Sequence, residues 1–337
     1  MNILVNKILI KKLKCLLEVK YCFIEVYAKM SRKIRYTKSE SARKKITKAQ
    51  INQINKVYND AYNNLAKKAK ALESKKNISS KLRKLYLDDF MKDLNKEMAN
   101  ANSKVGTILK DGAKGVAKEV VKENNKLLKN IGINVVGAYS YVPDKAIMQI
   151  INGNVYNGQW TLSKALWGAK RKNIKALEKI MQQSLAENKP IKEVVKELMK
   201  YSKSGNAKYN AYRLARTMTN HAYQKAFQMT TEKNPFIEAY QWNNGHADTD
   251  VCDLCKELAE TDGFGLGPGV FPKNEIPMDH PNGYCFITAI AMDDKQMIQC
   301  LADWVNGEGN LEMNKALDEF SEDMGLTSEI VKNNVKI

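Results

Sequence analysis

Residues 240–292 read YQWNNGHADTDVCDLCKELAETDGFGLGPGVFPKNEIPMDHPNGYCFITAIAM and differ in kind from the rest of the 337-residue chain. This segment holds three of the six cysteines and two of the three histidines. Glycine, proline and aspartate are frequent in it, whereas the residues before it are rich in lysine and follow a helical pattern. The segment therefore predicts a small unit of different structure after a helical region.

Four metal-binding side chains lie in this segment. Cys252 and Cys255 form a C-x-x-C pair, and His280 and Cys285 follow after a loop rich in glycine and proline. Four such donors fill a closed tetrahedral zinc site. Because the loop consists of turn-forming residues that build little core, a metal would supply stability that the segment lacks. We predict a structural zinc ion bound by Cys252, Cys255, His280 and Cys285.

Two other interpretations of the cysteines remain open. They are free thiols of a reducing compartment, or a redox C-x-x-C, although the βαβ pattern that accompanies redox pairs is not visible in the sequence. A catalytic metal is disfavoured, because four protein ligands leave no position for water. The remaining polar residues of the segment are expected to be solvated loop residues, turn formers or groups that hydrogen-bond the ligands; they are His246, Asp248, Asp250, Asp253 and Asp262.

The charge of the chain is divided unevenly along its length. The formal net charge is +18; residues 1–240 carry 49 Lys and Arg against 19 Asp and Glu, whereas residues 241–337 carry 6 against 18. A cationic region of this size favours a polyanionic partner, and an acidic one faces solvent or protein. The alternative is a lysine-rich composition whose charges only solvate the helix surfaces.

Residues 31–48 contain eight cations and a single acid, Glu40. A run of this kind is typical of a flexible basic arm that contacts the phosphate backbone of nucleic acid. The predicted contact residues are Arg32, Lys33, Arg35, Lys38, Arg43, Lys44, Lys45 and Lys48. Residues 1–29 are apolar and basic but contain no secretion signal and no membrane span, so we expect an extension ahead of Met30.

Periodic apolar residues predict long helices on either side of residue 79, the first opened by a capping box at Thr47. We expect an irregular link over 133–160, a helix capped by Thr161, and further helices after Pro190 and Gly205. His221 is expected to be a packing residue in the last of these. Residues 236–242 and 284–292 predict two antiparallel strands that bring both halves of the metal site together. Closing helices are expected over 295–305 and 310–324.

The predicted fold is therefore mainly α, a long helical bundle or stalk followed by a small α+β metal-binding domain with a short antiparallel β element. Its parts are a basic N-terminal extension or arm, long basic helices, a helical core, a zinc-knuckle-like domain and acidic C-terminal helices. These cover residues 1–48, 49–132, 133–235, 236–293 and 294–337 respectively.

Four further stretches carry a resemblance: VYNGQWTLSKALW, RLARTMTNHAYQKAF, QWNN and HPNGYC. Together with the C-x-x-C they resemble the head morphogenesis family of tailed phages, the Mu F-like minor head proteins, over about residues 133–293. Arg213, Arg216 and Thr217 match the R-x-x-R-T motif of that family, and Trp242 lies in its QWNN. Arg216 is expected to be an ion-pair or helix-end partner for the small domain. The family block H-P-N-C-R-C has Gly283 and Tyr284 here in place of its first Cys and its Arg.

The resemblance implies a minor capsid component inside the virion, at the portal vertex, assembled in the host cytoplasm. Its implied partners are the portal protein, the inner capsid and packaged double-stranded DNA, contacted without sequence specificity. One alternative is a zinc-dependent nuclease or toxin-type enzyme linked to a head module; another is a cellular zinc-ribbon regulator. Because the sequence contains no P-loop, no nucleophile with a base and no dense carboxylate and histidine cluster, we expect a protein that is not an enzyme. Since no apolar run is long enough to span a membrane, we expect no membrane partner.

Overall fold

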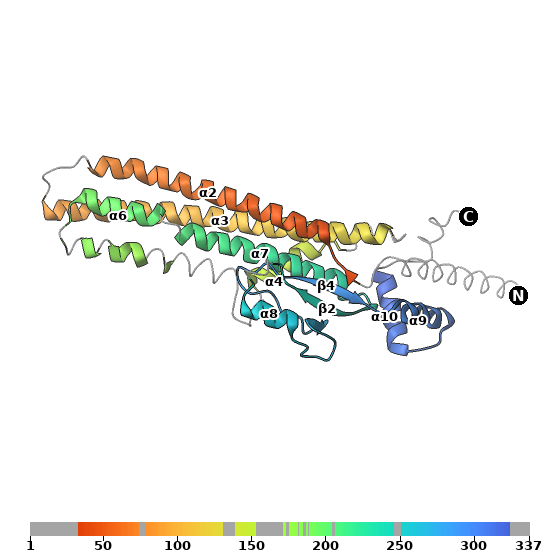
Figure 1. The fold of residues 1–337 in the computed structure, drawn as a ribbon. Helices are drawn as coiled ribbons and strands as arrows, with labels where there is room; N and C mark the ends of the chain where they lie inside the picture. Colours follow the sequence, from red (N-terminus) through yellow and green to blue (C-terminus); the bar gives the residue numbers. More distant parts are fainter. Residues whose placement is uncertain are drawn as a thin grey trace, which may run out of the picture.

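The computed structural model describes residues 33–73, 79–130, 139–152, 171–172, 175–180, 182–184, 187, 189–203, 206–245 and 251–323. Two long helices, α2 (Thr37–Glu73) and α3 (Ser80–Asn130), lie side by side along the molecule (Figure 1). Each buries an apolar side chain at almost every turn, from Ile54 to Ala69 on α2 and from Leu87 to Leu128 on α3. This periodic apolar stripe is what keeps two otherwise polar, lysine-rich helices together.

The helix α3 runs without interruption through three glycines. At Gly112 the two helices come so close that an added Cβ would lie 1.9 Å from Nε2 of Gln50. Gln50 fills that space and donates a hydrogen bond from Nε2 to the Ile108 carbonyl at 2.5 Å. The glycine therefore marks a close approach of α2 and α3 rather than a break in the helix.

Three shorter helices complete the helical part. They are α4 (Val142–Asn152), α6 (Ile191–Lys203) and α7 (Asn206–Thr231), and α7 packs against both long helices and α4. The irregular link expected over 133–160 is wrong for residues 142–152, which form α4. Pro143 does not prevent this helix, because it lies in the first turn, where the N–H that proline lacks would have no partner within the helix. The predicted cap Thr161 lies outside the described residues.

A four-stranded antiparallel sheet follows, in the order β1-β4-β2-β3. The strands are β1 (Lys33–Ile34), β2 (Ile237–Asn243), β3 (Val270–Pro272) and β4 (Phe286–Ala291). The predicted pairing of two strands is confirmed, with Tyr240 opposite Ala289 and Trp242 opposite Ile287. The sheet and helix α8 (Asp253–Glu260) lie beside one half of α7 (Figure 1). We call residues 237–291 the metal module.

The chain then continues into α9 (Asp294–Asn306) and α10 (Leu311–Asp323), the two predicted closing helices. Asn310 caps α10, since its side chain accepts hydrogen bonds from the amides of Glu312 and Met313. None of the helices in the described part of the chain is both long and apolar enough to cross a membrane.

The flexible basic arm expected over residues 31–48 is wrong for its described part. These residues belong to the folded core, because β1 pairs with β4 and α2 begins at Thr37 rather than at Thr47. The start of α2 is capped from a distance: the Glu123 carboxylate of α3 accepts hydrogen bonds from the amides of Lys38 and Ser39 at 3.0 and 2.6 Å. Because this capping residue is 85 residues away in the sequence, no nearby motif indicates where α2 begins.

Candidate metal centre

The C-x-x-C pair lies at the start of helix α8. Cys252 is the N-cap residue and Cys255 belongs to the first turn, so both thiols face the same end of the helix. The pair is therefore positioned by a helix, not by the free-standing turn that the predicted zinc knuckle would use.

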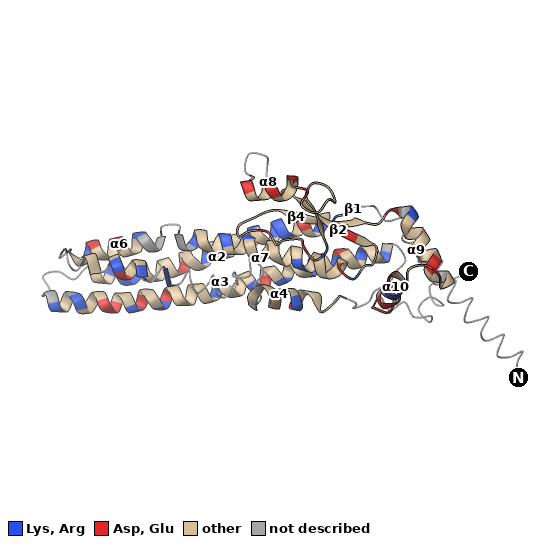
Figure 2. Ribbon diagram, turned by 90° about the horizontal axis from the view of Figure 1, so that it is seen from below, with Lys and Arg blue, Asp and Glu red and all other residues tan. Residues whose placement is uncertain are grey.

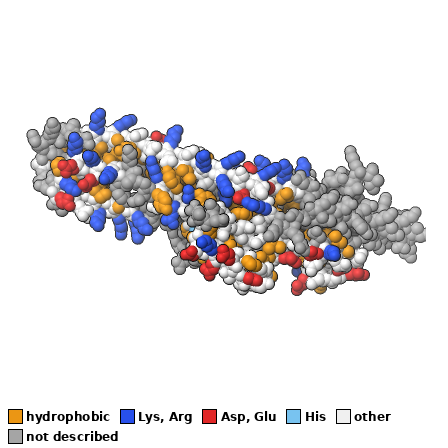
Figure 3. All heavy atoms as spheres, viewed as in Figure 1, with side chains coloured by type: hydrophobic (Ala, Val, Ile, Leu, Met, Phe, Trp, Pro, Cys, Tyr) orange, Lys and Arg blue, Asp and Glu red, His pale blue; other side chains and the backbone are white. Residues whose placement is uncertain are grey.

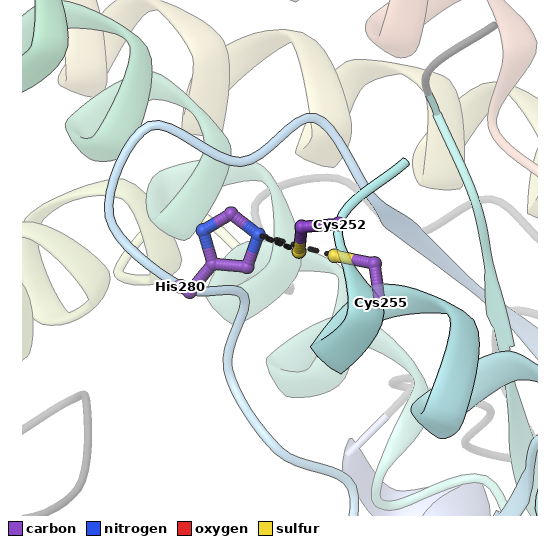
Figure 4. Close-up of side chains that lie close together, drawn as sticks. All are labelled: Cys252, Cys255 and His280. Atoms are coloured by element: carbon purple, nitrogen blue, oxygen red, sulfur yellow. Dashed lines mark hydrogen bonds between the residues drawn. The ribbon is translucent and has the colours of Figure 1, made fainter. Parts of the chain in front are cut away.

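His280 faces both of these sulfurs from the loop that leads into β4 (Figure 4). Its Nε2 atom lies 3.2 Å from Cys252 Sγ and 3.1 Å from Cys255 Sγ. The ligands of one tetrahedral zinc, with bonds of about 2.3 Å to sulfur and 2.0–2.1 Å to nitrogen, lie only slightly farther apart than this. Small outward movements of the side chains would therefore place a metal ion between them.

Cys285 joins the cluster through Cys255. The two sulfurs lie 3.3 Å apart, and Cys285 and Cys255 are both completely buried. Two overlapping groups of possible ligands result, one of Cys252, Cys255 and His280 and one of Cys255, Asp279 and Cys285. The structure thus brings together all four predicted ligands and adds Asp279, and these residues could hold a metal ion.

The imidazole of His280 is held in a suitable tautomer. Its Nδ1 lies 3.0 Å from the Pro281 carbonyl oxygen, an acceptor, so the proton belongs on Nδ1. This leaves a lone pair on Nε2, the atom that faces the sulfurs. A hydrogen bond of this kind from the far ring nitrogen is what orients most metal-binding histidines.

The two buried thiols differ in acidity. The side-chain interaction with Cys255 lowers the pKa of Cys285, and Trp242 and the Gly245 backbone lower it further, whereas burial and Asp279 act to raise it. The same interaction, together with burial, raises the pKa of Cys255. Because a metal ion binds cysteine as the thiolate, an ion bound here would displace the thiol protons of the cluster.

Asp279 is buried and holds the ligand loop together. Its Oδ1 accepts a hydrogen bond from the His280 amide at 2.8 Å, and its Oδ2 accepts one from the Cys285 amide at 3.0 Å. Burial raises the pKa of this carboxyl to about 6, although His280 and these amides act to lower it. Because both oxygens are already bonded to the backbone on either side, Asp279 fixes the positions of two ligands.

Gly283 belongs to the same arrangement. A Cβ at this position would lie 2.0 Å from Asp279 Oδ2, so the carboxylate occupies the space that any side chain would need. The glycine that departs from the H-P-N-C-R-C pattern and the buried carboxylate are therefore one structural feature. The adjacent Asn282 has φ of 72°, a left-handed conformation that asparagine tolerates better than most residues.

The helix α7 supports the loop with a row of buried polar side chains. Asn220 donates to Asp279 Oδ2 at 2.5 Å, and Gln224 accepts a hydrogen bond from the Asp279 amide at 3.0 Å. His221 bonds to the Asp279 carbonyl at 2.7 Å, and its burial lowers its pKa to about 4. The prediction that His221 is a packing residue is confirmed.

The residues of the R-x-x-R-T motif divide between two roles. Thr217 accepts a hydrogen bond from the Asn282 amide at 2.8 Å, and the Arg216 guanidinium lies 5.1 Å from the centre of the Tyr284 ring. Arg216 also reaches Asn282 Oδ1 at 3.5 Å, so it contacts the module, as expected, through an amide and a ring. Arg213 lies over Tyr209 of its own helix, outside this contact.

Asp253, Asp262 and Trp242 are not among the possible ligands, and the two aspartates have the solvated or turn-forming roles expected of them. Asp253 and Asp262 are exposed, and Asp262 accepts a hydrogen bond from the Leu266 amide, as a turn former does. Trp242 is buried in β2. Three residues lie outside the described part of the chain, namely His246, Asp248 and Asp250.

The basic residues of the predicted arm also differ from one another. Lys38, Lys44, Lys45 and Lys48 are exposed on α2, and Arg35 pairs with Glu40 at 2.8 Å. Lys33 lies in β1, and Arg32 is outside the described residues. The prediction that Arg43 contacts nucleic acid is wrong for the described structure, because its side chain is inside the protein and only 3% of the residue is exposed.

Sequence reasoning missed Asp279, Asn220 and Gln224. The available signal was the polar residues at positions 220, 221 and 224, whose spacing places them on one face of a helix. Comparison of the chain with known protein families, with curated proteins and with solved structures finds no match. The site is therefore interpreted from its own geometry.

Proposed function

We propose that this protein is a structural minor head protein of a tailed phage, in which a zinc-bound module is fixed against a basic helical bundle. The observation that supports it is a direct contact between two segments that carry the resemblance. The amide of Asn282, in the HPNGYC block, donates to Thr217 of the R-x-x-R-T motif, 65 residues away. These two motifs thus serve one joint between helix and module.

Zinc is the metal that suits the donors best. Three thiols and one imidazole are soft or borderline ligands, and zinc accepts this combination in tetrahedral structural sites. Four protein ligands also leave no place for a reacting water, which favours the structural role over the zinc-dependent nuclease or toxin-type alternative. The zinc acts by holding α8 to the loop before β4.

Contact with DNA is supported by the surface charge of the long helices. Figure 2 shows Lys and Arg spread along α2 and α3, with acidic residues among them toward one end of α3, and it shows further acidic residues on α8 and α10. In Figure 3 cationic side chains project from the edges of the bundle. Lys38 lowers the pKa of its neighbour Lys126 through their side-chain contact and their like charges, so an approaching phosphate would relieve repulsion there.

The acidic end of the chain is the surface that we assign to protein contact. The exposed acids of α10 include Glu312, Glu319 and Glu322, and like-charge repulsion would keep them from DNA. In the proposed head, the bundle faces the packaged genome and the end with α9 and α10 faces the portal or the inner capsid wall.

The gene neighbourhood and the encoded partners test this proposal. Portal and major capsid genes are expected beside the gene, and the full-length chain is expected to copurify with that portal protein when both are expressed together. Heads assembled with Glu312→Lys, Glu319→Lys and Glu322→Lys combined should lack the protein, whereas Lys45→Ser heads should retain it. A neighbourhood without head genes, and no association with the portal, would contradict the proposal.

A further inference from the structure

A buried chain of polar groups leads from the metal centre to helix α2. The guanidinium of Arg43 on α2 donates from Nη1 to the Asn220 side-chain carbonyl of α7. Asn220 in turn donates from Nδ2 to Asp279 Oδ2, and Asp279 holds the amides beside His280 and Cys285. Three groups from three parts of the chain therefore form a continuous relay, which we call the Arg43 relay.

The relay also has an electrostatic role, because Arg43 is a buried cation. Burial lowers the pKa of the guanidinium, and no carboxylate bonds it directly in the described structure. Its other contacts are the Tyr284 carbonyl at 3.4 Å and the face of the Tyr223 ring at 5.4 Å. A buried cation needs compensation, and here the negative charge of Asp279 reaches it through the Asn220 amide.

The central amide fixes the direction of the relay. Asn220 must present its oxygen to Arg43 and its nitrogen to Asp279, because a guanidinium only donates and a carboxylate accepts. Asp279 can bond Asn220 in this way only while the loop over residues 279–285 has its present form. That loop carries two of the four metal ligands.

We infer that the Arg43 relay couples metal binding to the seating of the N-terminal part of α2, with Asp279 and Arg43 acting as positioning residues for the ligands. The inference rests on the metal centre of the proposed function and adds that its effect reaches residues 37–50. Metal binding orders the 279–285 loop, the loop fixes Asp279, and Asp279 holds Arg43 through Asn220. The strand β1, just before α2, also pairs with β4, which directly follows the 279–285 loop.

The test uses full-length protein loaded with zinc and stripped of it. Zinc affinity is measured by chelator competition, and hydrogen–deuterium exchange is followed over residues 37–50. Stripping zinc from the wild-type protein should speed exchange in these residues as well as in the module. Arg43→Met should weaken zinc binding by about 10-fold or more, the range seen when groups supporting metal ligands are removed. Exchange at residues 37–50 should then no longer respond to zinc.

Lys45→Met is the matched control, since it removes an exposed cation from the same helix and should change neither readout. If Arg43→Met does not fold, Asn220→Leu interrupts the relay at its centre and Asp279→Asn at its metal end; both should weaken zinc binding. Wild-type protein that binds zinc while residues 37–50 ignore its removal would overturn the coupling alone. Wild-type protein that binds no zinc would overturn the metal centre and the coupling with it.

Discussion

The bundle and the metal module are stabilised in different ways. Beyond the first part of α2, whose buried side chains are mainly polar, α2 and α3 bury apolar side chains along their shared length, so their stability is spread over many similar contacts. In the module, helix α8 buries a single residue, Cys255, and the loop after it presents Phe264 and Leu266 to solvent. We therefore expect the bundle to tolerate removal of one side chain, whereas α8 and the loop after it should depend on the few donors of the candidate metal site.

The two regions nevertheless share one core. Tyr36, at the start of α2, contacts Phe227 of α7 at 4.6 Å between ring centres, and Phe227 contacts Tyr240 of β2 at 6.2 Å. This aromatic row passes from the bundle into the sheet without a break. Removing the module would therefore expose the core of the bundle, and point variants are the better way to separate the two.

The largest effect is expected from Cys255→Ser. Structural zinc contributes roughly 10–16 kcal/mol in small zinc-binding peptides, and Cys255 is the donor that contacts both halves of the site. The variant should lose its zinc in elemental analysis, and its module should exchange amide hydrogens rapidly while residues 80–110 stay protected. Cys300→Ser, in α9 outside the ligand cluster, is the control and should retain zinc. Full zinc content in Cys255→Ser would show that the site is built differently.

Truncation of a core side chain in the bundle should have a smaller effect, and this effect should fall on the stability of the protein and not on its zinc content. Leu109 on α3 is completely buried, and Leu109→Ala should lower the free energy of unfolding by about 2–5 kcal/mol. The zinc content should not change. Leu127→Ala removes the same atoms from a side chain that is 38% exposed and should cost much less. Equal reductions for the two variants, measured by denaturant unfolding, would contradict a stability that resides in the buried stripe.

Gly283→Ala tests the module at the scale of one methyl group. The new Cβ would collide with the Asp279 carboxylate, which three hydrogen bonds hold in place. We expect the free energy of unfolding to fall by about 1–3 kcal/mol, typical of overpacking, together with weaker zinc binding. Gly263→Ala is the matched control, because its Cβ would meet nothing within 4 Å. Unchanged zinc affinity in Gly283→Ala would show that Asp279 does not position the ligands.

The parts of the fold that could be predicted are those with a local signal. Apolar periodicity indicated α2, α3 and α7, and the C-x-x-C and H-x-x-x-x-C spacings indicated the four donors that the structure brings together. The alternating segments before and after them indicated the central strand pair. Each of these signals lies within a few residues of the feature that it predicts.

The parts that could not be predicted depend on partners far away in the sequence. The start of α2 depends on Glu123, so its first ten residues resembled a solvated arm. Arg43 was indistinguishable from its exposed neighbours, because the groups that it contacts inside the protein, such as Asn220, 177 residues away, are distant in the sequence. Asp279 was one acid among many in an acidic segment until the fold placed two ligand amides against it.

Alkaline unfolding compares the regions through one buried tyrosine in each. Burial raises the pKa of Tyr58 in the bundle and of Tyr240 in β2 from 10 to about 12. Because the folded pKa is above the unfolded value, the stabilisation is complete below pH 10 and is lost as pH rises toward 12. In Tyr58→Phe and in Tyr240→Phe the free energy of unfolding should fall less between pH 10 and pH 12 than it does in the wild type. Denaturant unfolding at several pH values measures this difference. An unchanged pH dependence would mean that the hydroxyls are not buried in solution.

The smallest effect concerns the surface charges that distinguish the basic bundle from the acidic module. Lys38 and Lys126 are neighbouring exposed cations on α2 and α3, so Lys38→Ser with Lys126→Ser should remove up to two phosphate contacts. On duplex DNA the slope of log affinity against log salt should become shallower by about 0.9 for each phosphate that the protein no longer neutralises, with no change in unfolding. Lys315→Ser, on the acidic helix α10, should leave the slope as it is. Similar slopes for the double variant and the wild type would mean that DNA does not lie against the start of α2. A change caused by Lys315→Ser would place the DNA at the acidic end, and the orientation proposed for the head would have to be reversed.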